Sequence, residues 1–311
     1  MIIIKDKNFS AGYIFLEDRE KYSPLFHGGC SGRKEHADMA DARVHSIETF
    51  SGVDGPGIRF VLFLNGCRLR CRFCHNPDTW DGNSGERKSA QEILAQALRY
   101  RDYWGDRCGS VRSDPAVDST QITGGITVSG GEPLLQMDFL TEFFRLAKKE
   151  GIHTCIDTAG EPFTTEEPWL SKFSVLMDYT DLLLVDIKQM NRKQHIRLTG
   201  RPNDNILSMF SYLDRIHKPV WIRQVLVPGW TDDPEDLRRE RNFIDTLSNV
   251  QKVEVLPYHT LGVYKWEKMG MKYPLSDVKP PDAAAVRRAE EILLPQRQEQ
   301  EESLFLDAAS H

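Results

Sequence analysis

The sequence predicts an α/β protein in which six parallel strands form a partial barrel with helices on its outside. Two features predict this architecture. Six short runs of consecutive apolar residues recur along the chain, which is typical of strands buried on both faces of a parallel sheet. Helix-like stretches separate most of these runs, and such alternation indicates a sheet built from βα units. Six strands are too few for a closed eight-stranded barrel, so the barrel is expected to be incomplete.

The predicted strands are, in chain order, residues 58–64, 126–129, 154–157, 182–187, 220–227 and 253–256. The clearest predicted helix spans residues 136–150, because its apolar residues lie three and four apart and Gly151 follows as a C-terminal cap. The same helical pattern is found in residues 203–217, 234–247 and 283–294.

The predicted barrel domain spans residues 43–295, and three segments differ from it in composition. Residues 1–42 are polar and lack a strand period, so we expect a loosely ordered N-terminal extension. Residues 103–124 are rich in Gly, Ser, Asp and Pro, which predicts an inserted surface loop. Residues 296–311 are expected to form a frayed C-terminal tail.

The overall composition excludes several classes of protein. Of the 311 residues, 40% are hydrophobic and 28% are charged, which argues against a disordered or fibrous chain. The formal net charge of −6 argues against bulk binding of nucleic acid. No apolar run reaches the length of a transmembrane helix or a secretory signal, so we expect a cytoplasmic protein that makes no membrane contact.

Three of the six cysteines, Cys67, Cys71 and Cys74, lie within eight residues and directly follow the first predicted strand. Clustered thiols in a cytoplasmic protein more often bind metal than form disulfides. Thiolates are the usual ligands of iron–sulfur clusters, and three of them leave one iron of a four-iron cluster without a protein ligand. An open coordination position is typical of metal sites that perform chemistry. Cys30, Cys108 and Cys155 are expected to be bystanders.

Three other interpretations of this cluster remain open from spacing alone. A zinc ion would need His75 as its fourth ligand, although His75 directly follows Cys74 and the two are poorly placed around one tetrahedral ion. The segment also matches the C-x-x-C-H pattern of c-type haem attachment, which normally requires export. Finally, the three cysteines can lie close together by chance.

Polar residues follow the carboxyl ends of four other predicted strands, where active sites of parallel barrels gather. They are Gly130, Gly131, Glu132, Asp157, Thr158, Asp186, Lys188 and His259. The glycine pair would let a ligand approach the backbone closely, or it forms a plain strand-to-helix turn. The two aspartates would contribute to a site, or they form structural ion pairs with Lys188 or a nearby arginine.

The stretch HSIETFSGVDGPGIRFVLFLNGCRLRCRFCHNPDTWD at residues 45–81 resembles the radical S-adenosylmethionine (radical SAM) superfamily. Within it, the chain is most similar to the glycyl-radical enzyme activases of the pyruvate formate-lyase type. The C-x-x-x-C-x-x-C spacing with an aromatic residue before the last cysteine marks the superfamily, and VDGPGIR and CHNPDTWD point to the activases. The resemblance continues through SGGEPLLQ, GIHTCIDTAG, LLLVDIKQMN, VWIRQVLVPGW, VLPYHTLGVYKWEKMG and DVKPP, and it covers roughly residues 43–295.

This resemblance implies a radical SAM partial barrel and a specific activity. Cys67, Cys71 and Cys74 would hold a [4Fe–4S] cluster that reductively cleaves S-adenosylmethionine (SAM). The resulting 5′-deoxyadenosyl radical would remove a hydrogen atom from a glycine Cα of pyruvate formate-lyase, the partner protein. Flavodoxin or ferredoxin would be the electron donor.

The resemblance also assigns roles to single residues. Lys188 joins the three cysteines as a catalytic residue. The positions implied to contact SAM are Phe73, Cys74, His75, Gly130, Gly131, Glu132, Asp157, Asp186, Ile187, Lys188 and His259. A monovalent cation, Na⁺ or K⁺, would be held by Asp157, Thr158, the Leu184 carbonyl and Asp186. The protein substrate would contact Asp54, His75 and Arg223.

Pyruvate formate-lyase is the favoured partner, because activases of several other glycyl-radical enzymes carry an insert with extra cysteines. Here the interval between Cys74 and Gly130 contains only Cys108. Two other functions remain as alternatives: a radical SAM enzyme acting on a small molecule or nucleobase, and a non-catalytic metal- or haem-binding module.

Overall fold

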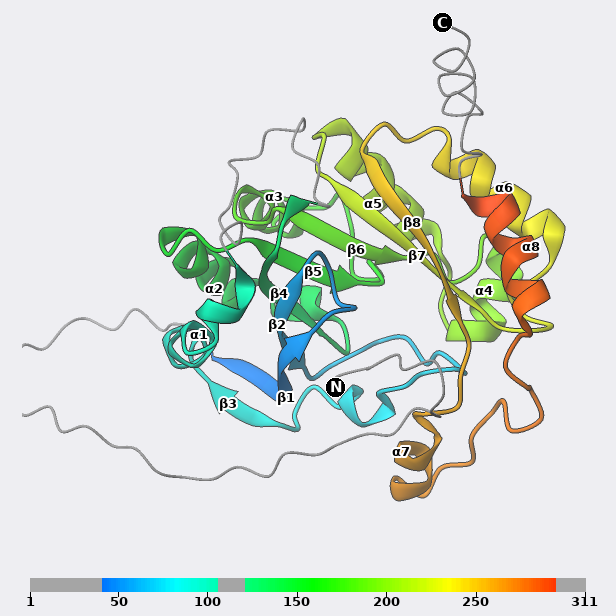
Figure 1. Ribbon diagram of the computed structural model, residues 1–311, viewed down its shortest axis with the longest axis horizontal. Helices are drawn as coiled ribbons and strands as arrows, with labels where there is room; N and C mark the ends of the chain where they lie inside the picture. The colour runs from blue at the N-terminus through cyan, green and yellow to red at the C-terminus, as the bar shows by residue number, and fades with distance from the viewer. Residues whose placement is uncertain (1–40, 106–120, 295–311) are drawn as a thin grey trace, which may run out of the picture.

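The computed structural model describes residues 41–105 and 121–294, which form one eight-stranded sheet and its flanking helices (Figure 1). The tail expected at residues 296–311, Cys30 and Cys108, most of the expected N-terminal extension and residues 106–120 of the expected surface loop all lie outside the described residues. The strands are β1 Ala42–Ser51, β2 Ile58–Leu64, β3 Glu86–Lys88, β4 Gly124–Gly130, β5 Thr154–Thr158, β6 Leu182–Asp186, β7 Val220–Leu226 and β8 Val250–Pro257.

The predicted core of six parallel strands is confirmed. Strands β2, β4, β5, β6, β7 and β8 pair in parallel in this order, and β3 and β8 are the two edges, so the sheet does not close. The sequence analysis missed β1 and β3, which add to β2 in antiparallel fashion. Strand β1 lies near one edge of the sheet, and most of its residues are only half-buried. It therefore lacks the continuous apolar run that identified the other strands.

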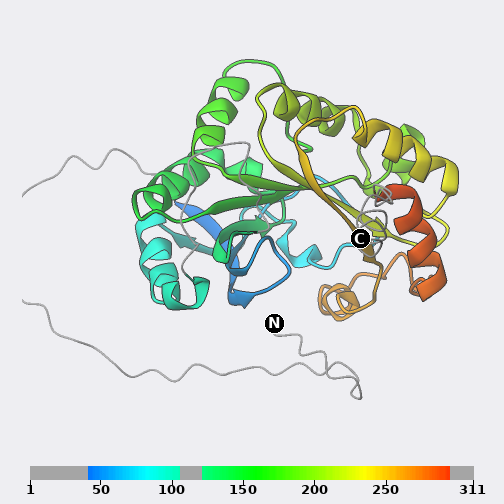
Figure 2. The ribbon, with the colours of Figure 1, turned by 45° about the horizontal axis from the view of Figure 1, so that its top comes forward.

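The helices are α1 Ala90–Leu98, α2 Met137–Lys149, α3 Trp169–Asp178, α4 Arg192–Thr199, α5 Asp204–Arg215, α6 Pro234–Ile244, α7 Val263–Lys268 and α8 Ala283–Leu293. The four predicted helices correspond to α2, α5, α6 and α8, with slightly shorter ends. Helices α1, α2 and α3 lie side by side, and α6 packs on α8 beyond β7 and β8 (Figures 1 and 2).

Alternation along the strands gives the sheet two unlike faces. The outer face and the helices share one large apolar core, to which the strands contribute Ile156, Leu183, Val185 and Ile222. The intervening residues point to the inner face, where a much smaller apolar cluster contains Cys155, Leu182, Leu184 and Trp221. The inner face therefore has room for polar side chains, and these gather toward the carboxyl ends of the strands.

We predict that Gly57→Ala destabilises the fold by about 3 kcal/mol or more. Gly57 has φ +66°, and an added Cβ would lie 2.0 Å from the carbonyl oxygen of Thr123. Gly151→Ala is the matched control, because Gly151 has φ +70° but open space around it, and its expected cost is about 1 kcal/mol. Urea unfolding measures both variants, and equal losses would show that the contact with Thr123 is unimportant.

Candidate functional site

Charged side chains meet on the inner face at the carboxyl ends of the central strands. Asp157, Asp186 and Arg223 lie on β5, β6 and β7, and parallel register places Asp186 beside Arg223. Three ion pairs connect this group. The Lys188 ammonium lies 2.7 Å from the Asp186 carboxylate, and Arg223 lies 3.5 Å from Asp157 and 3.2 Å from Glu254. The structural ion pairs anticipated as an alternative are therefore present.

These charges strongly affect one another because water has little access to them. Burial raises the pKa of the Asp157 carboxyl to about 6, despite the opposing effect of Arg223. Burial lowers the pKa of the Lys188 ammonium, but the Asp186 carboxylate and its other anionic neighbours outweigh this effect and raise it. Lys188 therefore remains charged, and its ammonium also lies 5.4 Å from the centre of the Phe73 ring. Ile187 is buried beside this group, and its N–H donates to the Arg223 carbonyl.

The three clustered cysteines lie on the loop that leaves β2, here called the thiol loop (residues 66–76). Burial alternates along the loop: Leu69, Cys71 and Phe73 are buried, whereas Arg68 and Arg70 are exposed. The end of α4 holds the loop in place, because the N–H groups of Arg70 and Arg72 donate to the last carbonyls of that helix. This contact satisfies acceptors that an isolated helix end would leave unpaired.

The thiols are close enough to influence each other's ionisation. Burial raises the pKa of Cys67 and Cys71 to about 12 and that of Cys74 to about 11, and each value is raised further by a neighbouring thiol. Without a cation beside them they are protonated. Among residues 41–105 and 121–294, no three His, Cys, Asp or Glu side chains form a group suited to a single metal ion. The described residues thus provide no preformed zinc site.

The predicted glycine pair has a clear packing role. A Cβ on Gly130 would lie 2.2 Å from the Leu64 nitrogen, and one on Gly131 would lie 2.2 Å from the Gly66 carbonyl oxygen. The chain after β4 therefore passes directly against the start of the thiol loop. The N–H of Glu132 donates to the Gly66 carbonyl at 2.7 Å, which joins the two segments.

The Glu132 carboxylate is buried and serves as an acceptor at the end of β4. It accepts hydrogen bonds from the Thr158 hydroxyl at 2.6 Å and from the N–H groups of Leu134 and Ala159. Burial raises its pKa to about 7, although these hydrogen bonds oppose the shift. The Thr158 hydroxyl is thereby committed to Glu132, and it also accepts from the Gly160 N–H.

Two predicted histidines, 184 residues apart, come together on the other side of the thiol loop. The rings of His75 and His259 stack with centroids 4.1 Å apart, and His75 Nε2 lies 3.1 Å from the His259 carbonyl oxygen. Burial, followed by the neighbouring His259, lowers the pKa of His75 to about 4, so its ring is neutral at physiological pH. The pair provides a flat aromatic surface at the rim of the site.

Asp54 lies in the turn before β2, where its carbonyl accepts from the Thr127 hydroxyl and its carboxylate accepts from Ser51. Arg223 reaches this turn as well, because its guanidinium donates to the carbonyl of Val53. The structure thus brings Asp54 and Arg223 to one side of the site, with the thiol loop and the histidine pair across the rim.

Comparison with known proteins places this geometry in a family. Residues 61–240 match the family model of the Radical SAM superfamily. The chain belongs to the radical SAM superfamily. It is 50% identical over 251 residues to a protein from Listeria monocytogenes serovar 1/2a named pyruvate formate-lyase-activating enzyme, covering 81% of this chain and 95% of that protein. A protein of the same name from Streptococcus mutans is 49% identical over 252 residues, covering 80% and 90% of the two chains.

Solved radical SAM structures share the fold at low sequence identity. Streptococcus suis SuiB bound to its precursor peptide SuiA superposes with a TM-score of 0.54 and 18% identity, covering 79% of this chain and 47% of that one. Among the described residues, no helix is long and apolar enough to span a membrane.

Radical SAM membership implies a [4Fe–4S] cluster and SAM. The thiol loop fits such a group, because it presents one buried and two partly buried cysteines near the positive charge of Lys188. A further observation supports the fit. The indole Nε1 of Trp80 is buried without a nitrogen or oxygen partner among the described residues, and its N–H is one of the groups that lower the Cys74 pKa against burial. A donor facing a sulfur is suited to a thiolate ligand.

The sequence analysis missed Trp80 and Trp266, which both pack against Cys74. The Trp266 indole donates to the Cys74 carbonyl at 2.9 Å, and its ring meets that of Trp80 edge to face. The only available signal was their position within CHNPDTWD and VLPYHTLGVYKWEKMG, since a contact over 192 residues leaves no local pattern.

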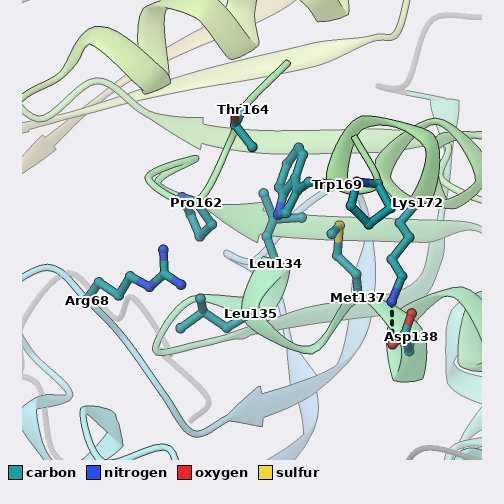
Figure 3. Close-up of a pocket in the computed structure, with 10 residues that line it drawn as sticks. Arg68, Leu134, Leu135, Met137, Asp138, Pro162, Thr164, Trp169 and Lys172 are labelled. Atoms are coloured by element: carbon teal, nitrogen blue, oxygen red, sulfur yellow. Dashed lines mark hydrogen bonds and ion pairs between the residues drawn. The ribbon is translucent and has the colours of Figure 1, made fainter. Parts of the chain in front are cut away.

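A hollow of about 430 Å³ lies outside this site, on the outer side of the thiol loop (Figure 3). Arg68, Leu135 and Pro162 border it, and the ion pair of Lys172 with Asp138 lies on another side. None of the predicted site residues lines it.

We predict that Arg223→Met lowers the free energy of unfolding at pH 7 by about 3 kcal/mol, because it leaves the buried Asp157 carboxylate without a cation. In the double variant with Asp157→Asn, part of this loss should be recovered, since no uncompensated charge remains. Urea unfolding of the wild type, both single variants and the double variant forms a complete cycle. Strictly additive losses would show that the two side chains do not interact.

Proposed function

We propose that this chain is an activase that generates the glycyl radical of pyruvate formate-lyase. The observation that carries the proposal is the placement of three free thiols, on a loop that follows a strand, beside a charged inner face. The 50% identity to a pyruvate formate-lyase-activating enzyme supports the same substrate for this chain. When bound, the cluster and SAM supply a one-electron cleavage that yields a carbon-centred radical, which takes a hydrogen atom from a glycine Cα of the partner.

In this proposal Cys67, Cys71 and Cys74 hold the cluster, and their thiolates form only as iron binds. The donors on the inner face bind SAM. Lys188 offers a permanent positive charge for a carboxylate, while the backbone beside Gly130 and Gly131 offers carbonyls for an amine. Glu132, which ties the glycine turn to the next strand, orients these carbonyls. Phe73, Ile187 and the His75–His259 pair exclude water and provide flat surfaces for the adenine.

A monovalent cation, Na⁺ or K⁺, would occupy the region of Asp157, Thr158, the Leu184 carbonyl and Asp186. Hard oxygen ligands suit such an ion. Each of the two carboxylates already has a cationic neighbour, so the cation would bind together with the SAM carboxylate, which restores the charge balance.

The turn around Asp54, with Arg223 and His75, would receive the glycine-bearing loop of pyruvate formate-lyase. A flavodoxin or ferredoxin would supply the electron. The cytoplasm is the compartment proposed, because iron-binding thiolates require a reducing environment.

We expect Cys71→Ala to abolish glycyl-radical formation, because two remaining thiolates should not hold a stable cluster. Reduced, iron-reconstituted protein is incubated anaerobically with SAM and pyruvate formate-lyase, and the doublet of the glycyl radical is recorded by EPR. Cys67→Ala and Cys74→Ala should behave in the same way.

Cys155→Ala is the matched control for these variants. Cys155 is fully buried, but it lies in the apolar cluster of the inner face, so activity and bound iron should be retained. Release of 5′-deoxyadenosine without a glycyl doublet would favour a small molecule or nucleobase as the substrate. Stoichiometric zinc or haem without acid-labile sulfide would contradict a radical enzyme altogether.

We further expect Trp80→Phe to make the cluster potential more negative by a few tens of millivolts. In the wild type, the Trp80 N–H stabilises the more negatively charged reduced state of the cluster, and the variant loses this stabilisation. A loss of about 1 kcal/mol corresponds to roughly 40 mV for a one-electron couple. An EPR-monitored redox titration measures the shift. Trp266→Phe removes a donor to a carbonyl rather than to a sulfur, so its shift should be smaller, and a larger shift would contradict the role given to Trp80.

A further inference from the structure

The thiol loop has a second side, which carries positive charge. Along the loop, the residues that alternate with Cys67, Leu69, Cys71 and Phe73 are all arginines: Arg68, Arg70 and Arg72. Phe73 faces Lys188 on the inner side, whereas Arg72 points the opposite way and donates from Nε to the carbonyl of Arg197 on α4. The burial of Leu69, Cys71 and Phe73 and the exposure of Arg68 and Arg70 therefore place the guanidinium groups on the surface of the loop.

Helix α4 and two tryptophans extend this basic side. The guanidinium groups of Arg72 and Arg197 lie 5.1 and 5.7 Å from the ring centre of Trp230, and that of Arg70 lies 4.7 Å from the ring of Trp80. Stacking on indoles holds the cations in fixed positions without neutralising them. We call the surface formed by Arg68, Arg70, Arg72 and Arg197 the arginine face.

The arginine face keeps its charge. Within the part of the chain that the structure describes, none of its four guanidinium groups forms an ion pair. By contrast, Arg223 is paired with Asp157 and Arg192 with Asp204. This concentration of positive charge stands out in a protein whose formal net charge is −6. Unpaired like charges repel one another and lower the stability of the free protein. A binding partner with negative charge would relieve this repulsion.

The arginine face also lies directly over the thiols. Arg70 Nη1 donates to the carbonyl oxygen of Cys67 at 2.6 Å, so the arginine face contacts the backbone of a cysteine of the thiol loop at this point. Arg68 borders the hollow of about 430 Å³, where Leu135 and Pro162 offer apolar surface beside the charge (Figure 3). A basic surface beside an apolar recess has the composition of a docking site for an acidic protein.

We propose that the arginine face is the docking surface for an acidic one-electron carrier protein, which delivers its electron through the thiol loop. This inference rests on the proposed function, because only a cluster held by these thiols requires such a donor. In the transfer the carrier loses one electron and the cluster gains it, and no bond forms or breaks. The protein substrate approaches at the turn of Asp54 and Arg223, which shares no residue with the arginine face, so both partners can be bound at once.

The test uses the double variant Arg68→Glu/Arg197→Glu, because neither side chain contacts a cysteine. Arg287→Glu/Arg288→Glu on α8 is the matched control, because both residues are exposed and this double variant changes the net charge by the same amount as the first. The probe is purified flavodoxin, with a plant-type ferredoxin in a second arm. Calorimetry measures the dissociation constant at low and at physiological salt, and stopped-flow absorbance measures the rate of cluster reduction by the reduced carrier.

We expect the first double variant to bind the carrier at least about tenfold more weakly at low salt, with a correspondingly slower reduction. Salt should weaken carrier binding by the wild type, because it screens the charges of the arginine face. This salt dependence of the dissociation constant should largely disappear in the first double variant, in which two of those charges are reversed. Its reduction by dithionite should be unchanged. The α8 variant should match the wild type in every measurement.

Equal affinity and rate in both double variants would overturn the proposal. It would also be overturned if carrier binding were intact but dithionite-driven activation of pyruvate formate-lyase fell, since the arginine face would then serve the protein substrate. Failure of the proposed function looks different: the wild type reduced with dithionite would then release no 5′-deoxyadenosine in the presence of SAM.

Discussion

The site depends on a set of backbone hydrogen bonds that hold the thiol loop from both sides. At its start, Gly66 accepts from the Glu132 N–H and donates to the Thr79 carbonyl. In its middle, Arg70 and Arg72 donate to the end of α4. A loop rich in arginine and cysteine has no core of its own, so these contacts from neighbouring elements must fix its shape. Because these contacts use main-chain groups, the three cysteine side chains remain available for chemistry.

The inner face presents a second constraint, which is the balance of buried charge. Asp186 and Lys188 neutralise each other, Arg223 pairs with Asp157 and Glu254, and Lys252 also pairs with Glu254. The methionine part of SAM carries an ammonium, a sulfonium and a carboxylate, so its binding would add one net positive charge to the site. Burial raises the pKa of Asp157, which marks a carboxylate that is shielded from water even though Arg223 lies beside it.

Much of the fold and part of the site could be predicted from the sequence, for identifiable reasons. Strands such as β6 are buried on both faces, so their apolar runs are unmistakable, and the rim residues follow directly from where those runs end. Strand β1 and helix α4 were missed because both are largely polar, and only their neighbours explain why they are ordered. The choice of partners within the charged group, and the approach of Trp80 and Trp266 to Cys74, depend on contacts between distant segments. No local pattern encodes such contacts.

The division of the thiol loop into two sides is seen in the burial of its residues. Leu69, Cys71 and Phe73 are buried, whereas Arg68 and Arg70 are exposed. Arg72 turns to α4, where its Nε donates to the Arg197 carbonyl. Arginine at these positions is not needed to bind the cluster, and apolar residues would bury the loop equally well against Trp80 and Trp230. The outward arginines therefore need a reason that lies outside this chain, and a protein that must supply electrons to the buried side provides one.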